Sequence, residues 1–336
     1  MNRFPPELLA SYPALRHVKS TPAQASGGYS GAGVWMVTAE ENRFALRRWP
    51  RSGLSKDRIL GLHRLLRHIA ATHANLVSVP VPAKDGSTLL PIDGSLWQLE
   101  PWLPGVASFW TQPSDQKLTN AMQALAHWHA AANRFEAKSH EAQWFGSRRM
   151  ETSPAIQERL RIVDRWLPDE LAEVRQLVIR NSEFDRLAVR LCSMCQIALP
   201  TIRDELTSAL NIKVNLQPCL RDVWHDHVLF ENDAVTGIID PSACRTETIA
   251  TDIARLLGSL AEDDEGMWQA GLAAYDSYHP LSDDTFRLVR ILDRSTVVLS
   301  PLTWLRRRYI LKTSFDEEAV LTRLQRLTKR LMAFRQ

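Results

Sequence analysis

The sequence predicts an α+β fold in two lobes, in which a small antiparallel sheet with one main helix precedes a larger, mostly helical region. Extended apolar runs gather in the first hundred residues, and a proline- and glycine-containing stretch follows at 99–105. Apolar residues recur at helical spacing through most of the remainder. We therefore expect an N-terminal lobe over 1–98, a hinge over 99–105 and a helical C-terminal lobe over 106–336.

Short strands and one long helix account for the N-terminal lobe. A glycine-rich turn at 27–31 leads into the first strand, and a polar turn at 40–42 joins it to the second, as in a hairpin. Ser55 is a suitable cap for the helix that follows. The predicted elements are strands Val34–Val37 and Phe44–Trp49, a helix Ser55–Ala71, and extended runs near Leu76–Val77 and Ser95–Leu99 on either side of a turn at Lys84–Gly86.

Helical periodicity dominates the C-terminal lobe, with short strands in its middle. A polar connection covers Asn133–Pro154, and the short strands carry Asp222 and Asp240. The predicted helices are Leu118–Ala132, Leu160–Arg180, Phe184–Leu210, Thr251–Leu260, Met267–Tyr278, Asp283–Trp304 and Asp316–Phe334.

Composition and charge exclude several classes of protein. The chain is 45% hydrophobic and 24% charged, which is typical of a globular protein, and its net charge of +3 is too small to indicate a nucleic-acid partner. No apolar run approaches the roughly 18 residues of a membrane helix, and Met1–Leu15 lacks the basic-then-apolar order of a signal peptide. We expect a cytoplasmic protein with neither a membrane nor a nucleic-acid partner.

The four cysteines are too few for a disulfide scaffold. Cys192 and Cys195 have the spacing of a zinc or redox pair, but they fall within a predicted amphipathic helix, and Cys219 and Cys244 form no second close pair. Buried helical thiols are therefore the favoured interpretation.

The most informative stretch is Leu220–Phe230, which an apolar strand ending at Asp240 follows. An aspartate, a polar residue five positions on, and a second aspartate after a strand are typical of phosphoryl-transfer sites in kinase-like folds. Asp222 would accept the proton of a substrate hydroxyl, while His227 and Asp240 would face a metal bound to nucleotide phosphates. An aspartate that ends an apolar strand is costly to bury unless it is paired or binds metal, which favours a functional Asp240.

Seven motifs in order, over nearly the whole chain, resemble those of the aminoglycoside phosphotransferase and choline kinase-like family, which has a protein-kinase-like fold. The resemblance implies a bilobal fold whose N-terminal lobe covers a nucleotide. The motifs are Gly27–Gly31 with Val34–Val37, Ala45–Pro50, Leu99–Gly105, Leu125–His129, the Asp222 loop, Ile239–Asp240 and Thr251–Ala254.

The resemblance further implies an ATP-dependent phosphotransferase that uses Mg²⁺ or Mn²⁺ and acts on a hydroxyl of a small molecule. Glycines let backbone N–H groups approach phosphate oxygens, although a Gly-Gly sequence also suits a plain hairpin turn. Arg47 stands where the family places a cation against the phosphates, with Arg48 on the opposite face; a solvated strand edge is the alternative for both. The residues expected to bind ATP are Gly28, Ser30, Gly31, Arg47, Glu100 and Trp102.

The first departure from the family pattern concerns the partner of this arginine. In kinases a glutamate on the following helix holds the cation, but 55–71 contains no glutamate and His63 stands at about the matching place. We therefore expect Arg47 to lack its usual anion, unless Asp57 approaches it.

The second departure lies in the catalytic loop, where Leu220-Arg221 replaces the family's His-Gly and His227 replaces its asparagine. Arg221 could neutralise a phosphate or pair with a carboxylate. Magnesium prefers oxygen ligands, whereas imidazole suits manganese or zinc better. His227 could thus bind a metal with a shifted preference, hydrogen-bond Asp222 and fix it, or be structural.

Two further residues allow a functional and a structural interpretation. The resemblance implies that Asp252 braces the catalytic loop, but a helix cap would explain the same aspartate. His129 has a family counterpart, yet its apolar helical face favours a hydrogen-bonded core histidine.

A different hypothesis makes the loop a transition-metal centre for hydrolysis. It would use His225, Asp226 and His227 with the two aspartates of the motif. Strand alternation would direct Asp226 away from both histidines, which disfavours this hypothesis.

The acceptor cannot be named from the sequence. The acidic run 262–265, with Trp268, Trp304 and Tyr309, could attract and stack on a cation, but it also resembles a solvated helix N-terminus, and tryptophans are usually core residues. Arg306–Arg308 favours an anion equally.

Two functions therefore remain open. One is a small-molecule kinase with Asp222 as base, Asp240 and His227 on a metal, and Arg47 on phosphates. The other is a catalytically impaired relative that binds a nucleotide or metabolite as a sensor or scaffold. The two retained aspartates favour the kinase, whereas the missing glutamate and asparagine favour the binding protein. The sequence leaves the oligomeric state open.

Overall fold

The computed structural model describes residues 4–15, 23–24, 32–73, 76–179 and 181–333. The chain forms two compact units. The first consists of Met1–Ser147 and His225–Thr246, and the second of Arg148–Trp224 and Glu247–Gln336. Each unit is thus built from two separate stretches of the chain. The lobe and hinge boundaries expected from the sequence stay a prediction.

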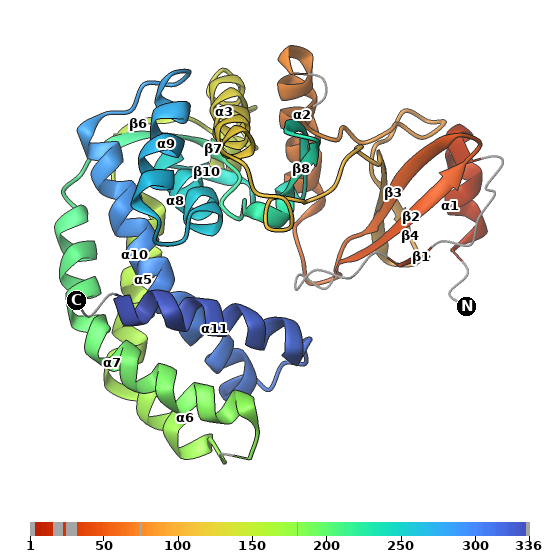
Figure 1. Ribbon diagram of the computed structural model, residues 1–336. Helices are drawn as coiled ribbons and strands as arrows, with labels where there is room; N and C mark the ends of the chain where they lie inside the picture. Colours follow the sequence, from red (N-terminus) through yellow and green to blue (C-terminus); the bar gives the residue numbers. More distant parts are fainter. Residues whose placement is uncertain (1–3, 16–22, 25–31, 74–75, 180, 334–336) are drawn as a thin grey trace. The chain divides into compact units, whose positions relative to one another are not determined.

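A five-stranded antiparallel sheet forms one end of the first unit (Figure 1). Its strand order is β1-β2-β3-β5-β4. Hairpin turns join β2 to β3 and β4 to β5, so neighbouring strands pair with short connections. The strands are β1 (Ala23–Gln24), β2 (Gly33–Ala39), β3 (Asn42–Arg48), β4 (Leu90–Ile92) and β5 (Ser95–Pro101).

The two faces of this sheet have different chemistry. Helix α1 (Pro6–Ser11) and the short helix η1 (Pro13–Leu15) cover one face, where Leu46 and Leu99 are fully buried. Successive side chains of a strand point to opposite faces, so Arg47 projects from the other one. Arg48 packs over the rings on the α1 face, 5.4 Å from Trp35. The predicted opposite orientation of the two arginines is confirmed.

One predicted strand is wrong. Residues Leu76–Val77 form a turn after the second helix, in which the Leu76 N–H donates to the carbonyl of His73. The partner of β5 is instead β4, joined to it through Asp93-Gly94. Both turn residues have positive φ, 51° and 68°, as a two-residue hairpin of this type requires.

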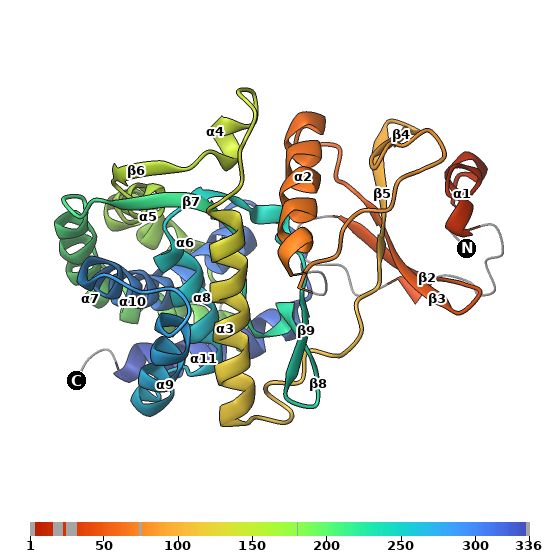
Figure 2. The ribbon, with the colours of Figure 1, turned by 90° about the horizontal axis from the view of Figure 1, so that it is seen from above.

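The remainder of the first unit consists of helices and a two-stranded hairpin. The hairpin lies beside α3, whose Asn120 donates to the carbonyl of Asp233 (Figure 2). Ser55 caps α2 as predicted, accepting from the N–H of Arg58. These elements are α2 (Lys56–Thr72), α3 (Asp115–Ala132), α4 (Ala142–Phe145), η3 (His225–His227), β8 (Val228–Glu231), β9 (Ala234–Ile238), η4 (Pro241–Ala243) and β10 (Arg245–Glu247), whose last residue belongs to the second unit.

Residues 103–106, which follow β5, form hydrogen bonds with this hairpin. Val106 and Phe230 exchange backbone hydrogen bonds of 3.1 and 2.9 Å, and the Thr236 hydroxyl donates to the carbonyl of Pro104. Gly105 has φ +86°, and a Cβ there would lie 2.7 Å from the Phe230 oxygen. Only glycine fits this approach, so the glycine fixes the hairpin that carries His227 and Asp240 at its base.

The second unit is mainly helical. Its long helices α7 and α10 pack together, and α8 packs against α10. The helix expected over Leu160–Arg180 starts earlier, because Pro154 suits a first helical turn, and a π turn interrupts it. The elements are β6 (Arg148–Glu151), α5 (Pro154–Arg165), η2 (Trp166–Glu170), α6 (Leu171–Leu177), α7 (Glu183–Ala209), β7 (Val214–Cys219), α8 (Ile249–Leu260), α9 (Glu265–Asp276), α10 (Asp283–Leu305), η5 (Arg306–Ile310) and α11 (Glu317–Ala333).

The cysteines are buried thiols, as predicted. Cys192 and Cys195 are fully buried in α7, and burial raises the pKa of Cys192 to about 11. Such thiols stay protonated at neutral pH and are poor metal ligands or nucleophiles. Within the described ranges, no helix has the length and apolar character needed to cross a membrane.

The close approach at Gly105 gives a test of the fold. Gly105→Ala introduces both an unfavourable positive φ and a clash with the hairpin, so it should lower the free energy of unfolding by about 2 kcal/mol or more. Gly86→Ala is the matched control, because Gly86 has φ +83° but no atom within 4 Å of an added Cβ. It should cost only about 1 kcal/mol in denaturant titrations. Equal losses would contradict the fastening role of Gly105.

Candidate functional site

Arg47 is the centre of a buried charge cluster in the first unit. Its side chain is 10% exposed, its Nε lies 3.5 Å from a carboxylate oxygen of Glu100, and its Nη1 lies 3.2 Å from Oδ1 of Asp240. Burial alone would lower the pKa of Arg47, but the two carboxylates outweigh burial and raise it. The alternative of a solvated strand edge is therefore wrong for Arg47.

Glu100 supplies the anion that the sequence appeared to lack. The glutamate of the helix is missing, as expected, and a carboxylate of β5 takes its place. In the sheet, Glu100 lies opposite Ala45 and Gln98 lies opposite Arg47. The side chains of Glu100 and Arg47 therefore project from the same face. Among the described residues the carboxylate partners of Arg47 are Glu100 and Asp240, and Asp57 lies exposed in the first turn of α2.

His63 belongs to the same network and is neutral. Its Nε2 lies 2.9 Å from Oε1 of Gln98, which also accepts from Trp49, and its Nδ1 lies 2.8 Å from the Thr88 hydroxyl. Gln98 in turn donates to Glu100 at 3.2 Å. Burial lowers the pKa of His63 to about 4. His63 therefore replaces the helix glutamate indirectly, since it orients Gln98 and, through Gln98, the carboxylate that holds the arginine.

Asp240 lies at the base of the β8–β9 hairpin beside His227. The Ile239 N–H donates to the His227 carbonyl, and Asp240 adopts a left-handed conformation with φ 55°. Burial would raise the pKa of Asp240, but Arg47 and His227 lower it below its ordinary value. Asp240 is thus an ionised carboxylate beside an imidazole, and this pair of donors suits Mg²⁺ through oxygen and Mn²⁺ through both.

Asp252 holds the loop that carries Asp222 in the second unit. Its fully buried carboxylate accepts from the backbone N–H groups of Leu220 at 2.6 Å and Arg221 at 2.5 Å. The cap of α8 is Thr248, whose hydroxyl accepts from Ala250. The bracing role of Asp252 is confirmed and the alternative of a helix cap is wrong.

Arg221 occupies a position that suits glycine. Its φ is 65°, which is uncommon for a residue with a side chain. Its guanidinium lies 2.5 Å from Glu158 and 3.9 Å from Glu247, so it pairs with carboxylates. These contacts hold the loop backbone in the left-handed conformation that precedes Asp222.

Asp222 is exposed and paired with an arginine that the sequence did not indicate. Its Oδ1 accepts from Nε and Nη2 of Arg255 at 3.2 and 3.0 Å. Arg255 lies on α8 three residues after Asp252, one helical turn along the same face, which is the signal that could have revealed it. Arg47, Glu100, His227 and Asp240 belong to the first unit, whereas Asp222 belongs to the second.

The other residues expected to bind ATP are less well defined. Gly28, Ser30 and Gly31 lie outside the described residues. The N–H of Trp102 donates to the carbonyl of Arg43 at 3.0 Å, and the side chain of Glu100 is occupied by Arg47. Their contact with a nucleotide stays a prediction.

The proposed transition-metal centre does not form in the first unit. Residues 225–227 form a 3-10 turn rather than a strand, so Nε2 of His225 lies 3.4 Å from Asp226, contrary to the expected alternation. In the described part of this unit, these residues and Asp240 do not bring three ligand atoms within 4.8 Å of one another. His129 is fully buried in α3, in agreement with a core histidine.

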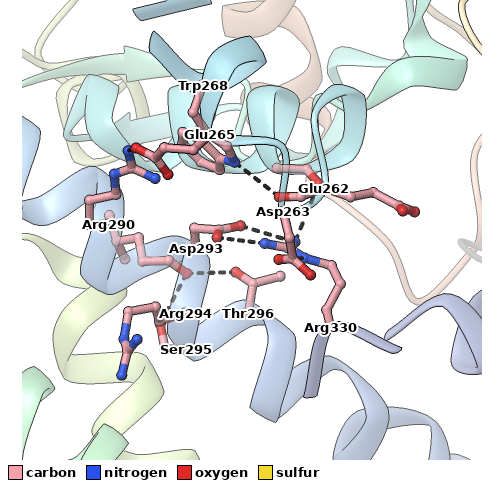
Figure 3. A network of polar contacts seen from close by, with 12 residues as sticks. Glu262, Asp263, Glu265, Trp268, Arg290, Asp293, Arg294, Ser295, Thr296 and Arg330 are labelled. Atoms are coloured by element: carbon pink, nitrogen blue, oxygen red, sulfur yellow. Dashed lines mark hydrogen bonds and ion pairs between the residues drawn. The ribbon is translucent and has the colours of Figure 1, made fainter. Parts of the chain in front are cut away.

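Three side chains of the acidic run 262–265 have structural partners, two of which are labelled in Figure 3. Asp263 lies 2.8 Å from Arg330, Glu265 pairs with Arg290, and Asp264 caps α9. The interpretation as a helix N-terminus is confirmed for Asp264, and attraction of a cation loses its support.

The remaining acceptor candidates are also structural. Trp268 and Trp304 are buried, and the Tyr309 hydroxyl donates to Asp185 at 2.6 Å. In the arginine run, Arg306 pairs with Glu170 and Arg308 with Glu317. This run is therefore occupied within the fold.

A family model described as "Phosphotransferase enzyme family" matches residues 21–287. The chain belongs to this family. No curated protein sequence matches the chain. The family match agrees with the resemblance found in the motifs.

Solved structures of phosphotransferases share the fold of this family member. An aminoglycoside phosphotransferase from Alicyclobacillus acidocaldarius is 15% identical, with a TM-score of 0.67, over 99% of this chain and 95% of the other. An amicoumacin kinase with AMP-PNP and Ca²⁺ is 16% identical (TM-score 0.62; 97% and 96% covered). A spectinomycin phosphotransferase with ADP and spectinomycin is 12% identical (TM-score 0.64; 92% and 89% covered). The predicted α+β, kinase-like fold is confirmed.

The buried His63 predicts a pH dependence of stability. Its pKa falls from an ordinary 6.5 to about 4 on folding, so between these values the unfolded chain binds more protons. The neutral form of His63 therefore contributes fully to the free energy of unfolding above pH 6.5, and this contribution is lost as the pH falls towards 4. His63→Gln should flatten the decline in unfolding free energy over this range, whereas the exposed-site control His140→Gln should keep the wild-type slope. Identical slopes in all three proteins would contradict a neutral buried His63.

Proposed function

We propose that the protein transfers the γ-phosphoryl group of ATP to a hydroxyl of a small molecule. The observation that carries the proposal is the buried Arg47, held charged between Glu100 and Asp240 on the face of the sheet opposite α1. A guanidinium oriented in this way can bind two phosphate oxygens at once. The family match and the nucleotides bound to similar structures support the same conclusion.

Asp222 would act as the general base. It would accept the proton of the acceptor hydroxyl while the hydroxyl oxygen bonds to the γ-phosphorus and the bond to ADP breaks. Its backbone is held by Asp252, so the exposed carboxylate is presented from a fixed loop. Asp240 and His227 would hold a divalent cation, which neutralises charge on the phosphates when bound.

One observation favours the alternative of a binding protein that does not transfer phosphate. Both candidate carboxylates pair with arginines, Asp240 with Arg47 and Asp222 with Arg255. If these pairs persist when a nucleotide binds, metal binding and proton acceptance are both impeded. The protein would then bind a nucleotide or metabolite as a sensor or scaffold.

Removal of the base separates these two functions. Asp222→Ala should lower the rate of phosphoryl transfer by about 10²–10⁴-fold and leave ATP binding unchanged, because Asp222 contributes to proton transfer and not to nucleotide affinity. Asp226→Ala, an exposed aspartate four residues on, is the control and should retain activity. ADP release with a panel of hydroxyl acceptors measures transfer. Unchanged activity in Asp222→Ala would overturn the assignment of the base.

Metal dependence tests the other carboxylate site. Calorimetric titration with ATP should show binding that requires Mg²⁺ or Mn²⁺, and metal-independent or absent binding would refute the phosphotransferase site. If His227 binds the ion, His227→Asn should shift the ratio of affinities towards Mg²⁺ by about tenfold, because an amide oxygen replaces an imidazole nitrogen. His225→Asn is the control on the same turn. An unchanged ratio in His227→Asn would leave His227 only a hydrogen-bonding or structural role.

A further inference from the structure

Two arginines from different helices converge on the ring of Trp224, two residues after the candidate base. The Arg255 guanidinium on α8 lies 5.8 Å from the ring centre, and that of Arg323 on α11 lies 5.0 Å from it. Arg255 also donates to Asp222. Base, ring and both cations belong to the second unit, so their arrangement does not depend on the nucleotide-binding residues of the first.

The nearby carboxylates of this unit already have partners within the fold. Glu158 and Glu247 face Arg221, and Asp252 binds backbone N–H groups. Near the C-terminal end of α8, Asp263 and Asp293 both hold Arg330 (Figure 3). The carboxylates of Glu158, Glu247, Asp252, Asp263 and Asp293 are thus engaged within the fold.

Arg159 of α5 lies close to Arg221 and Arg255. Burial first, and then the charges of Arg221 and Arg255, lower the pKa of Arg159 to about 10, although Glu247 and Asp293 oppose this change. Guanidiniums are therefore close enough here to repel one another. An ammonium group placed beside Asp222 would add to this repulsion, whereas an oxyanion would relieve it.

The pair between Arg255 and Asp222 contributes little to stability, because the carboxylate is 56% exposed and exposed ion pairs are weak. It does occupy Oδ1, one of the two carboxylate oxygens that could accept a proton. A ligand that replaces Asp222 as the partner of Arg255 would release that oxygen.

We propose that the acceptor is an anionic hydroxy compound, with a carboxylate or phosphate near its reacting hydroxyl, and that Arg255 and Arg323 bind this group. The inference rests on the proposed phosphotransferase function. Binding of the anion to Arg255 frees Asp222, which takes the hydroxyl proton as the oxygen bonds to the γ-phosphorus and ADP leaves. Both arginines can bind an oxyanion through two N–H groups, and Trp224 fixes their planes.

Four three-carbon compounds that share a vicinal diol test the charge of the acceptor. The full chain, with ADP and Mg²⁺ in excess, is titrated calorimetrically with glycerate, glycerol 3-phosphate, glycerol and 3-aminopropane-1,2-diol. At least one of the two anions should bind more tightly than glycerol by about tenfold or more. The amine should bind no more tightly than glycerol. Equal affinities, tightest binding of the amine, or no binding of any compound up to ~10 mM would overturn the proposal.

Variants locate the effect. Arg323→Gln should weaken binding of the preferred anion about tenfold and leave glycerol unchanged, and Arg323→Lys, which keeps the charge, should recover part of the loss. Lys329→Gln removes the same charge from an exposed position of α11 and should have no effect. Equal losses in Arg323→Gln and Lys329→Gln, or no loss in either, would overturn the assignment. Thermal melting and ADP binding of each variant confirm that it is folded.

ADP binding is measured first on the same samples, which separates the two proposals. If the unmodified protein does not bind ADP, the phosphotransferase function is refuted. Normal ADP binding without a preference for anions would refute only the acceptor class.

Discussion

The first unit depends on the burial of one guanidinium. Arg47 is almost inaccessible to water, and a buried cation is tolerated only if carboxylates and hydrogen bonds compensate for its lost hydration. Glu100 and Asp240 do this from β5 and from the end of the β8–β9 hairpin, so the same charge links the sheet to the hairpin. Burial raises the pKa of Glu100 although Arg47 opposes it, whereas the pKa of the less buried Asp240 is lowered. Asp240 is therefore the carboxylate whose negative charge the cluster maintains most firmly.

A similar principle holds the loop of the second unit, with backbone amides in place of a guanidinium. The fully buried carboxylate of Asp252 accepts two short hydrogen bonds from backbone N–H groups. Because carboxylates are strong acceptors for backbone N–H groups, these two bonds fix the loop conformation before Asp222. Arg221 keeps a positive φ, which glycine adopts more readily, and its ion pair with Glu158 offsets the backbone cost. The replacement of His-Gly by Leu-Arg is thus compatible with a loop that still presents its aspartate.

Local patterns predicted the elements and the identity of the central residues, but not their partners. The alternation along β3 places Arg47 and Arg48 on opposite faces, and Ser55 and the apolar spacing predict α2. The pairing of Arg47 with Glu100 depends on the register of β3 against β5, which are far apart in sequence, and Arg323 approaches Trp224 only through the packing of α11. Asp93-Gly94 has the residue types of a two-residue hairpin turn, whereas the apolar residues Leu76–Val77 lie in a turn after α2. The assumed strand at 225–227 failed because a 3-10 turn has no two-residue alternation.

The two arginine pairs have a common physical meaning for a phosphotransferase. Each pair joins a carboxylate with a proposed role in the reaction to a guanidinium, which binds oxyanions well. The pairs are Asp240 with Arg47 and Asp222 with Arg255. A phosphate offers such a guanidinium two oxygens and a greater negative charge, so an anionic ligand competes directly with the protein's own carboxylate. On the proposed function, nucleotide binding would draw Arg47 towards phosphate and leave Asp240 for a cation, and the anionic group of the acceptor would draw Arg255 away from Asp222. The absence of a glutamate on α2 is consistent with this exchange, because Glu100 remains to hold Arg47 when Asp240 is engaged elsewhere.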